Sequence, residues 1–256
     1  MAGGFAGQRC GEATKLRPRS WAQKLASSVV SADEQSGCPA TPHQDSCLKT
    51  PESLFVILKL MKILIIEGIP TSGKSSVIRE ISKLLGESKV RVYGEPKTHE
   101  PIMDQPEQLH IHFFKSLLQD ALETNAELVI FDRFHFTQAS RAKAGIGAYS
   151  EIEDLLAKQE TLVVYLQIDE SAIADRIKLT AERRDGEDSE DFQWGEYFRT
   201  KGDTFAEIAE HYATQQRGNK ELLNQSKLKS QTFDTTNHNY RDIANQIING
   251  WFVKDY

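Results

Sequence analysis

The chain has 256 residues, of which 39% are hydrophobic and 27% charged, and its net charge is −6. This length allows one compact domain with an extension. The acidic balance gives no reason to expect a nucleic-acid partner, because binding to a phosphate backbone needs a basic surface. The longest apolar run, residues 54–66, is interrupted by Lys59 and Lys62. It is too short and too charged to cross a bilayer, so we expect no membrane association.

The first 60 residues are rich in Gly, Ser, Pro, Gln and Thr and follow no helical or strand period, which predicts a disordered extension. Three interpretations stay open: a flexible tail, an organelle transit peptide favoured by the basic residues between Arg9 and Lys24, or an upstream start before a working protein that begins at Met61. The three cysteines, Cys10, Cys38 and Cys47, all lie here and match no zinc spacing. We therefore expect a reducing compartment, the cytoplasm, or an organelle if the extension is a transit peptide.

From Met61 onward, strand-like and helix-like segments alternate through a predicted domain at residues 61–256. The predicted strands are 62–67, 90–93, 127–131, 161–168 and a short one near 232–233. The predicted helices are 75–85, a long one within 106–124, 171–178, about 192–214 and 240–251. This alternation is typical of an α/β fold with a parallel sheet between two layers of helices, in which ligands bind at the carboxyl edge of the strands.

A phosphate-binding loop, Gly68-x-x-x-x-Gly73-Lys74-Ser75, stands between the first predicted strand and the first predicted helix. Its glycines let successive backbone N–H groups surround an anion, Lys74 reaches the β- and γ-phosphates, and the Ser75 hydroxyl is a Mg²⁺ ligand. No base-reading motif of the Asn-Lys-x-Asp type follows, which disfavours a GTPase. We predict that ATP with Mg²⁺ binds to Gly68, Thr71, Ser72, Gly73, Lys74, Ser75 and Ser76.

Two further polar motifs follow predicted strands. Asp132 and Arg133 end the third strand, where the carboxylate would hold Mg²⁺ and the guanidinium would offer a fork of donors to a phosphate or a substrate hydroxyl. Glu95 follows the second strand, where it would accept a proton from an attacking hydroxyl or organise water bound to Mg²⁺. We therefore name Lys74, Glu95, Asp132 and Arg133 as candidate catalytic residues, with Ser75 and Asp132 as metal ligands.

An arginine-rich segment follows the fourth strand, with Arg176 and Lys178 and then Arg183 and Arg184 ahead of an acidic run at 185–191. A mobile lid with arginines would stabilise the charge that spreads over a transferring phosphoryl group, and it would exclude water. We therefore add Arg183 and Arg184 to the candidate catalytic residues. A solvated charged surface is the alternative interpretation of the same segment.

In this order, the motifs resemble the thymidylate kinase and deoxynucleoside kinase group of P-loop kinases over about residues 61–250. The likeness is carried by Glu67-Gly68, Glu95-Pro96, Asp132-Arg133-Phe134, 166–169 with 174–177, Tyr197-Phe198 with 205–209, and 233–237. It implies a P-loop kinase domain at 61–256, with a five-stranded parallel sheet in the order 2-3-1-4-5 and an arginine-rich lid. It also implies that Glu95 is a base, that Arg133 contacts the acceptor, and that Asn237 lies in the loop bordering the adenine. A homodimer is compatible with it.

The acceptor-binding positions depart from that family. Residues 137–142 read Thr-Gln-Ala-Ser-Arg-Ala where thymidylate kinases generally read Ser-x-x-Ala and then Tyr-Gln-Gly, and Gly94 replaces an arginine. The stretch 108–115 lacks the family's arginine and holds His110, His112, Phe113 and Phe114, which either stack on a base or pack in the core.

Three functional hypotheses follow. The first is ATP-dependent transfer of the γ-phosphate to a small-molecule acceptor, a nucleoside monophosphate, as in a thymidylate kinase. The second is a deoxynucleoside kinase or a P-loop kinase of another small hydroxyl compound. The third belongs to a different class and is an ATP-binding regulatory protein without turnover. The presence of Glu95, Asp132, Arg133 and the lid arginines argues against the third.

Overall fold

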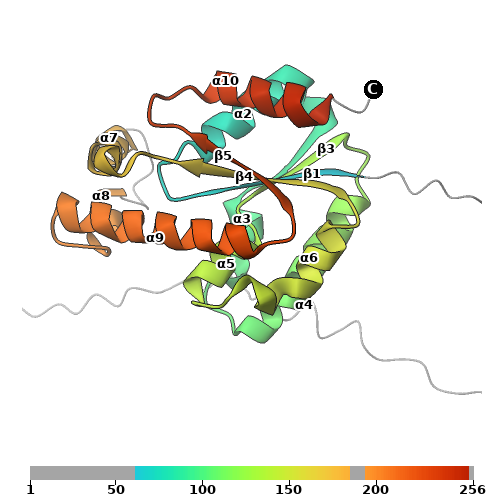
Figure 1. Ribbon diagram of the computed structural model, residues 1–256, viewed down its shortest axis with the longest axis horizontal. Coiled ribbons are helices and arrows are strands. Elements are labelled where there is room, and N and C mark those ends of the chain that lie inside the picture. Colours follow the sequence, from blue (N-terminus) through green and yellow to red (C-terminus); the bar gives the residue numbers. More distant parts are fainter. Residues whose placement is uncertain (1–60, 185–193, 254–256) are drawn as a thin grey trace, which may run out of the picture. The chain divides into compact units, whose positions relative to one another are not determined.

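The computed structural model describes residues 61–184 and 194–253. The predicted extension at 1–60 and the acidic part of the predicted lid therefore lie outside the described residues. The core is a parallel sheet made of β1 (Lys62–Gly68), β2 (Val90–Tyr93), β3 (Leu128–Asp132), β4 (Glu160–Gln167) and β5 (Lys229–Asp234) (Figure 1). Its strand order is β2-β3-β1-β4-β5, which confirms the order implied by the family resemblance. The chain thus has the three-layer P-loop fold.

The middle strand β1 shows why the sheet is covered on both sides. Ile63 and Ile65 point into one apolar cluster, and Leu64 and Ile66 point into another, because successive side chains of a strand face opposite sides. The first cluster lies under α4 (Glu107–Leu122), α5 (His135–Arg141), α6 (Ser150–Leu156) and the end of α9 (Phe205–Gln225). The second lies under α2 (Lys74–Leu85) and α10 (Tyr240–Ile247), on the opposite face in Figure 1. A strand buried on both faces is apolar over its central part, as residues 63–66 are between Lys62 and Glu67.

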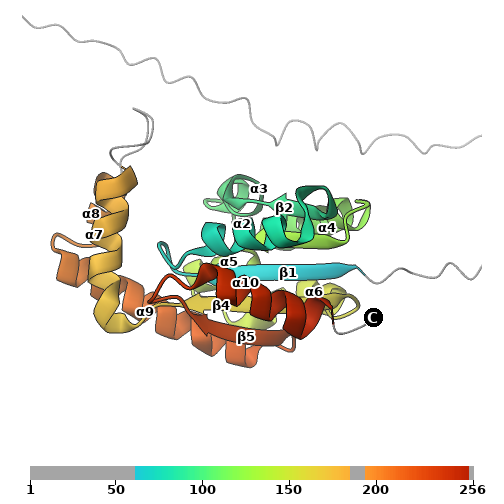
Figure 2. The ribbon, with the colours of Figure 1, turned by 90° about the horizontal axis from the view of Figure 1, so that it is seen from above.

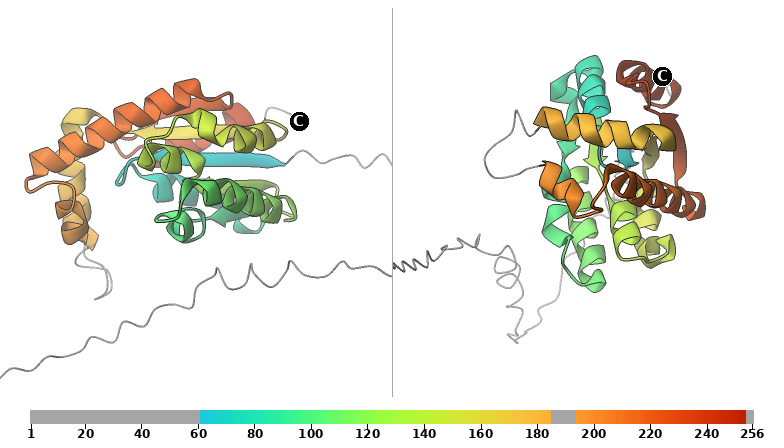
Figure 3. Two further views of the ribbon diagram at one scale, coloured as in Figure 1. Left: turned by 90° about the horizontal axis from the view of Figure 1, so that it is seen from below. Right: turned by 90° about the vertical axis from the view of Figure 1, so that its left-hand side faces the viewer.

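A third apolar cluster lies beyond the carboxyl edge of the sheet. The long helix α9 extends past that edge, where α7 (Ile173–Arg184) and α8 (Trp194–Arg199) pack on it (Figures 2 and 3). Ile69 of the phosphate-binding loop joins this cluster, together with Ile173, Phe198 and Tyr212. The loop is therefore packed against the helices that flank the predicted lid.

The predicted helix at 192–214 is wrong. Two helices, α8 and α9, replace it, and Gly202 lies in the turn between them. A Cβ atom at Gly202 would come within 2.7 Å of the Glu207 Cβ, so the turn requires glycine. Thr204 then begins α9 through a capping box with Glu207, in which each side chain accepts a backbone N–H of the other.

Other elements are longer or shorter than predicted. The helix predicted at 171–178 is preceded by a 3₁₀ turn (Glu170–Ala172) and continues as α7 to Arg184. The one-turn helix α3 (Glu95–Thr98) and the short helices α5 and α6 were not predicted, because segments this short contain too few turns to show a period. The remaining turns are 3₁₀ at Glu87–Lys89, Glu100–Ile102 and Ile146–Tyr149, and π-helical at Ile248–Phe252. No helix in the described part of the chain is long and apolar enough to cross a membrane.

Candidate functional site

The phosphate-binding loop runs from the end of β1 to the start of α2, as predicted. Its two glycines are required by space as well as by conformation. A Cβ atom at Gly68 would lie 2.5 Å from the Leu166 carbonyl oxygen, and one at Gly73, where φ is +87°, would lie 2.2 Å from Cε1 of Tyr240. Any other residue at either position would push the loop away from β4 or from α10.

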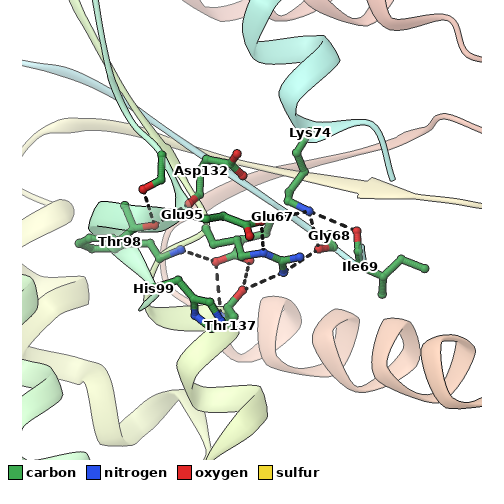
Figure 4. A network of polar contacts seen from close by, with 12 residues as sticks. Glu67, Gly68, Ile69, Lys74, Glu95, Thr98, His99, Asp132 and Thr137 are labelled. Carbon is green, nitrogen blue, oxygen red and sulfur yellow. Dashed lines mark hydrogen bonds and ion pairs between the residues drawn. The ribbon is translucent and has the colours of Figure 1, made fainter. Parts of the chain in front are cut away.

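Lys74 lies buried within the loop. Its Nζ donates to the carbonyl oxygens of Gly68 at 3.3 Å and Ile69 at 3.2 Å, and it lies 3.9 Å from Oε1 of Glu95 (Figure 4). Burial, and after it the charge of Arg133, lowers the pKa of Lys74 to about 8. The ammonium group has long hydrogen bonds and little solvation, so a phosphate that enters the loop would bind it strongly.

Arg133 follows β3 with a positive φ of 62°, which turns its side chain back under the loop. Its Nε donates to Oε1 of Glu95 at 2.6 Å, and its Nη1 donates to the Gly68 carbonyl at 3.0 Å and to Thr137 Oγ1 at 3.4 Å. Arg133 therefore links β1, α3 and α5. Most of its donors are already engaged by the protein.

Glu95 begins helix α3 and faces the loop across the cavity. Burial alone would raise the pKa of this carboxyl group, but the charges of Arg133 and Lys74 outweigh it and bring the pKa to about 2. The carboxylate is therefore ionised at neutral pH, and in this arrangement it accepts protons poorly. The structure thus supports an orienting and electrostatic role for Glu95 more than the role of a strong base.

Asp132 ends β3 and lines the same cavity as Ser75. Its backbone carbonyl accepts a hydrogen bond from Thr98 Oγ1 at 2.7 Å, but its buried Oδ1 has no hydrogen-bond partner among the described residues. Burial raises the pKa of Asp132, and the charge of Lys74 opposes that shift. An orphaned carboxylate oxygen and an exposed serine hydroxyl that line one cavity fit Mg²⁺, which usually takes one or two protein ligands and completes its shell with water and phosphate oxygens. No cluster of three or more ligand-type side chains that could hold a metal by itself exists within 61–184 and 194–253.

Glu67 is a buried carboxylate that was not predicted to belong to the site. It accepts hydrogen bonds from the Phe134 N–H at 2.8 Å and from Thr137 Oγ1 at 2.7 Å, and so it fixes the start of α5 to β1. Burial raises its pKa, while the charge of Arg133 lowers it. In the sequence, the only indication of this role was that Glu67 is an acidic residue at the end of an otherwise apolar strand.

The predicted residues converge on one cavity of about 1970 Å³. Predicted residues that line it are Thr71, Gly73, Lys74, Ser75, Ser76, Glu95, Asp132, Arg133 and Arg183. Gly68 and Ser72 support the loop from beneath, since Ser72 is fully buried and the Gly68 carbonyl accepts from Lys74 and Arg133. After β5, His238 in the loop and Tyr240 at the start of α10 line the cavity, whereas Asn237 is not among the lining residues. The side chain of Arg184 lies outside the described part of the chain.

Arg176 holds parts of the fold together and does not belong to a mobile lid. It is buried, and its guanidinium donates to the Thr235 carbonyl at 3.1 Å, to Tyr240 Oη at 2.9 Å and to the Thr71 carbonyl at 3.3 Å. Arg176 therefore ties α7 both to the phosphate-binding loop and to the loop after β5. The sequence placed Arg176 in the arginine-rich segment of the predicted lid, because its hydrogen-bond partners lie far away in the chain and could not be seen from the sequence.

The aromatic stretch on α4 contributes to the core, except for His112, which is exposed. Phe113 and Phe114 are buried in the apolar cluster on that face of the sheet. The ring of His110 lies between Tyr149 Oη and the Gln105 carbonyl, at 3.0 Å from each. None of these three residues is among those that line the cavity. Of the two alternatives for the stretch, the structure therefore supports core packing, and other residues must recognise the acceptor.

No protein-family model matches the chain, and no curated protein matches it. Similar solved structures include the YorR protein from Bacillus subtilis in complex with phosphorylated GDP, at 24% identity over 73% of this chain and 93% of that chain, with a TM-score of 0.49. They also include thymidylate kinase from Candida albicans (17%, 75% and 92%, TM-score 0.46) and shikimate kinase from Acinetobacter baumannii (17%, 78% and 97%, TM-score 0.44). At these identities and TM-scores, the likenesses assign no activity to this chain.

Proposed function

We propose that the protein is an ATP-dependent phosphotransferase whose acceptor is a small phosphate-bearing molecule of the nucleoside monophosphate class. The observation that supports this most directly is the convergence of Lys74, Glu95, Asp132 and Arg133 on one cavity beside the phosphate-binding loop. In P-loop enzymes, positioning and electrostatic stabilisation supply most of the catalysis of phosphoryl transfer. A site with two cations and two carboxylates around the loop offers both.

The proposed roles of these residues use their positions around the loop. The loop N–H groups and Lys74 bind the β- and γ-phosphates of ATP, and Arg133 stabilises the charge on the transferring group. Mg²⁺, held by Ser75 and Asp132 together with phosphate oxygens, would neutralise the charge that develops between the β- and γ-phosphates. Glu95 keeps Arg133 and Lys74 in place through its two ionic contacts.

The state of Glu95 favours an acceptor that is already ionised. A neutral hydroxyl group must lose its proton as it attacks, and a base suited to that task has a pKa near the working pH. Glu95 is instead engaged at 2.6 Å by Arg133, and its pKa is about 2. A phosphate oxygen of a nucleoside monophosphate is an anion at neutral pH and needs no such base. This favours the monophosphate class over nucleosides and other alcohols.

The test uses the full chain with Mg·ATP against nucleoside monophosphates, their nucleosides and small alcohols, with ADP release as the readout. We expect release that depends on a monophosphate and falls by about 10²–10³-fold in Lys74→Ala, because a charge-stabilising donor is lost. Lys83→Ala is the matched control, since Lys83 is an exposed lysine on the same helix, paired with Glu80. Release with nucleosides alone would support a nucleoside kinase. ATP binding without ADP from any acceptor would support a regulatory protein.

A further inference from the structure

A chain of three polar side chains lies along the cavity that also contains the phosphate-binding loop. The guanidinium of Arg141, at the end of α5, lies 2.8 Å from Nε2 of His99 through Nη1. The other ring nitrogen, Nδ1, lies 2.8 Å from the side-chain amide of Gln138. His99 and Arg141 both line the cavity, and Gln138 is buried behind them.

The chemistry of Arg141 determines the state of His99. A guanidinium group can only donate, so Nε2 of His99 accepts and the ring hydrogen lies on Nδ1. The structure places Nε2 of the Gln138 amide against Nδ1. Two donors cannot share this contact, so we assign the amide with its oxygen toward the ring, where it accepts the hydrogen of Nδ1. Burial, together with the charges of Arg133 and Arg141, lowers the pKa of His99 to about 4. The imidazole therefore stays neutral at physiological pH and keeps Arg141 fixed against the cavity wall.

Arg141 has more unused donors than Arg133, whose Nε and Nη1 make three hydrogen bonds within the protein. Among the described residues, the side chain of Arg141 has one hydrogen-bond partner, His99, and no carboxylate lies within 4 Å of it. Of the five N–H groups of a guanidinium, four thus remain for a ligand. The nearby acidic groups are Glu95, which is paired with Arg133, and Glu100, which lines the cavity and is exposed.

The position of Arg141 suits an acceptor that reacts at Arg133. Thr137 and Arg141 lie four residues apart on α5, so their side chains are on the same side of the helix. Thr137 Oγ1 is also the atom that contacts Arg133. Arg141 therefore lies one helical turn along α5 from the residue that contacts Arg133.

We propose that Arg141, held by His99 and Gln138, is the specificity-determining residue of the acceptor site and binds the phosphomonoester group of the acceptor. The planar fork of a guanidinium matches two phosphate oxygens, which a lysine or a neutral side chain does not. His99 and Gln138 are positioning residues that hold the fork in place. This inference rests on the proposed phosphotransferase function and assigns the recognition step to residues of α5 and the turn after α3.

The test measures KM for the acceptor and for ATP, and kcat, in the full chain. In Arg141→Ala we expect KM for a nucleoside monophosphate to rise by about 10- to 100-fold, because charge-assisted hydrogen bonds are lost, while KM for ATP changes less than about twofold. Arg141→Lys should be intermediate. His99→Ala should raise the acceptor KM less than Arg141→Ala, and His99→Gln, which keeps an acceptor for the guanidinium, should recover part of it. Arg79→Ala is the control, because Arg79 is an exposed arginine on α2 that is not among the cavity-lining residues.

Binding without turnover separates this inference from the proposed function. Calorimetry would compare the common nucleoside monophosphates with their nucleosides, in the wild type and in Arg141→Ala, without ATP. Monophosphate binding that is lost in Arg141→Ala supports the inference even if no acceptor yields ADP. The absence of ADP would then contradict only the proposed function. An unchanged acceptor KM in an active Arg141→Ala enzyme, equal binding of monophosphates and nucleosides, or no monophosphate binding at all would overturn it.

Discussion

The buried carboxylate of Glu67 should stabilise both the fold and the site through its bond to Thr137. Glu67 is 2% exposed and accepts from Thr137 Oγ1 at 2.7 Å and from the Phe134 N–H at 2.8 Å. These contacts join β1 to the first turn of α5, directly after Arg133. Replacing Glu67 by Gln preserves the shape but removes the charge and one of the two acceptor oxygens. The new amide N–H group then faces the Thr137 hydroxyl, which already accepts from Arg133.

The size of the effect follows from these contacts. A hydrogen bond to a charged group contributes about 1.5–3 kcal/mol, and a buried donor left unsatisfied costs about 1–3 kcal/mol. We therefore expect Glu67→Gln to lower the free energy of unfolding by about 2–4 kcal/mol. Thr137→Val, which removes one of the two close donors, should lower it by about 1.5–3 kcal/mol. The double variant should lose less than the sum, with a coupling energy of about 1–2 kcal/mol.

Urea unfolding followed by circular dichroism would measure all four free energies of unfolding at pH 7. Glu87→Gln serves as the control, because Glu87 is an exposed glutamate whose replacement should change the free energy by less than about 0.5 kcal/mol. Losses that simply add in the double variant would refute the reasoning, since Glu67 and Thr137 would then stabilise the protein independently. A change in the slope with urea would show that the denatured state had also changed.

Two further predictions concern the phosphate-binding loop and the helix that follows it. Gly86→Ala should lower the free energy of unfolding by about 1–3 kcal/mol, because φ there is +92° with open space around it. Gly73→Ala adds a clash with Tyr240, so it should lower the free energy of unfolding in urea further and abolish ATP binding. Equal effects of the two substitutions would contradict this account. The pKa of Lys74 is about 8 in the folded protein against its ordinary 10.5. Between pH 8 and pH 10.5 the unfolded chain therefore binds more protons than the folded protein, and the stability of the ATP-free protein should rise with pH over this range. ATP should restore the charge, so calorimetry at about pH 8.5 in two buffers of different ionisation enthalpy should detect proton uptake on binding that Lys74→Arg lacks. The same observed heat of binding in both buffers would mean that no proton is taken up and would contradict this prediction.

Much of the donor side of the site was predictable from sequence, for reasons that are local. The phosphate-binding loop is a contiguous stretch whose glycines, lysine and serine act at neighbouring positions, so its spacing alone indicates its chemistry. Lys74, Asp132 and Arg133 could be placed together because all follow strands of a parallel sheet, whose carboxyl ends share one edge. The apolar run of β1 indicated a strand buried on both faces, because a strand with one face in water would alternate apolar and polar residues.

The residues of the proposed acceptor side were visible only in the tertiary structure. His99 and Arg141 are 42 positions apart, and Arg176 reaches Thr71 across 105 positions, so no local pattern could indicate that they are partners. The same holds for Glu95, whose position after a strand suggested a base, whereas its proximity to Arg133 makes it a paired anion. The sequence by itself determined the loop, the strand types and the edge where ligands bind, because these depend on spacing and period. Only packing decided which polar groups are engaged and which, like the guanidinium of Arg141, stay free for a ligand.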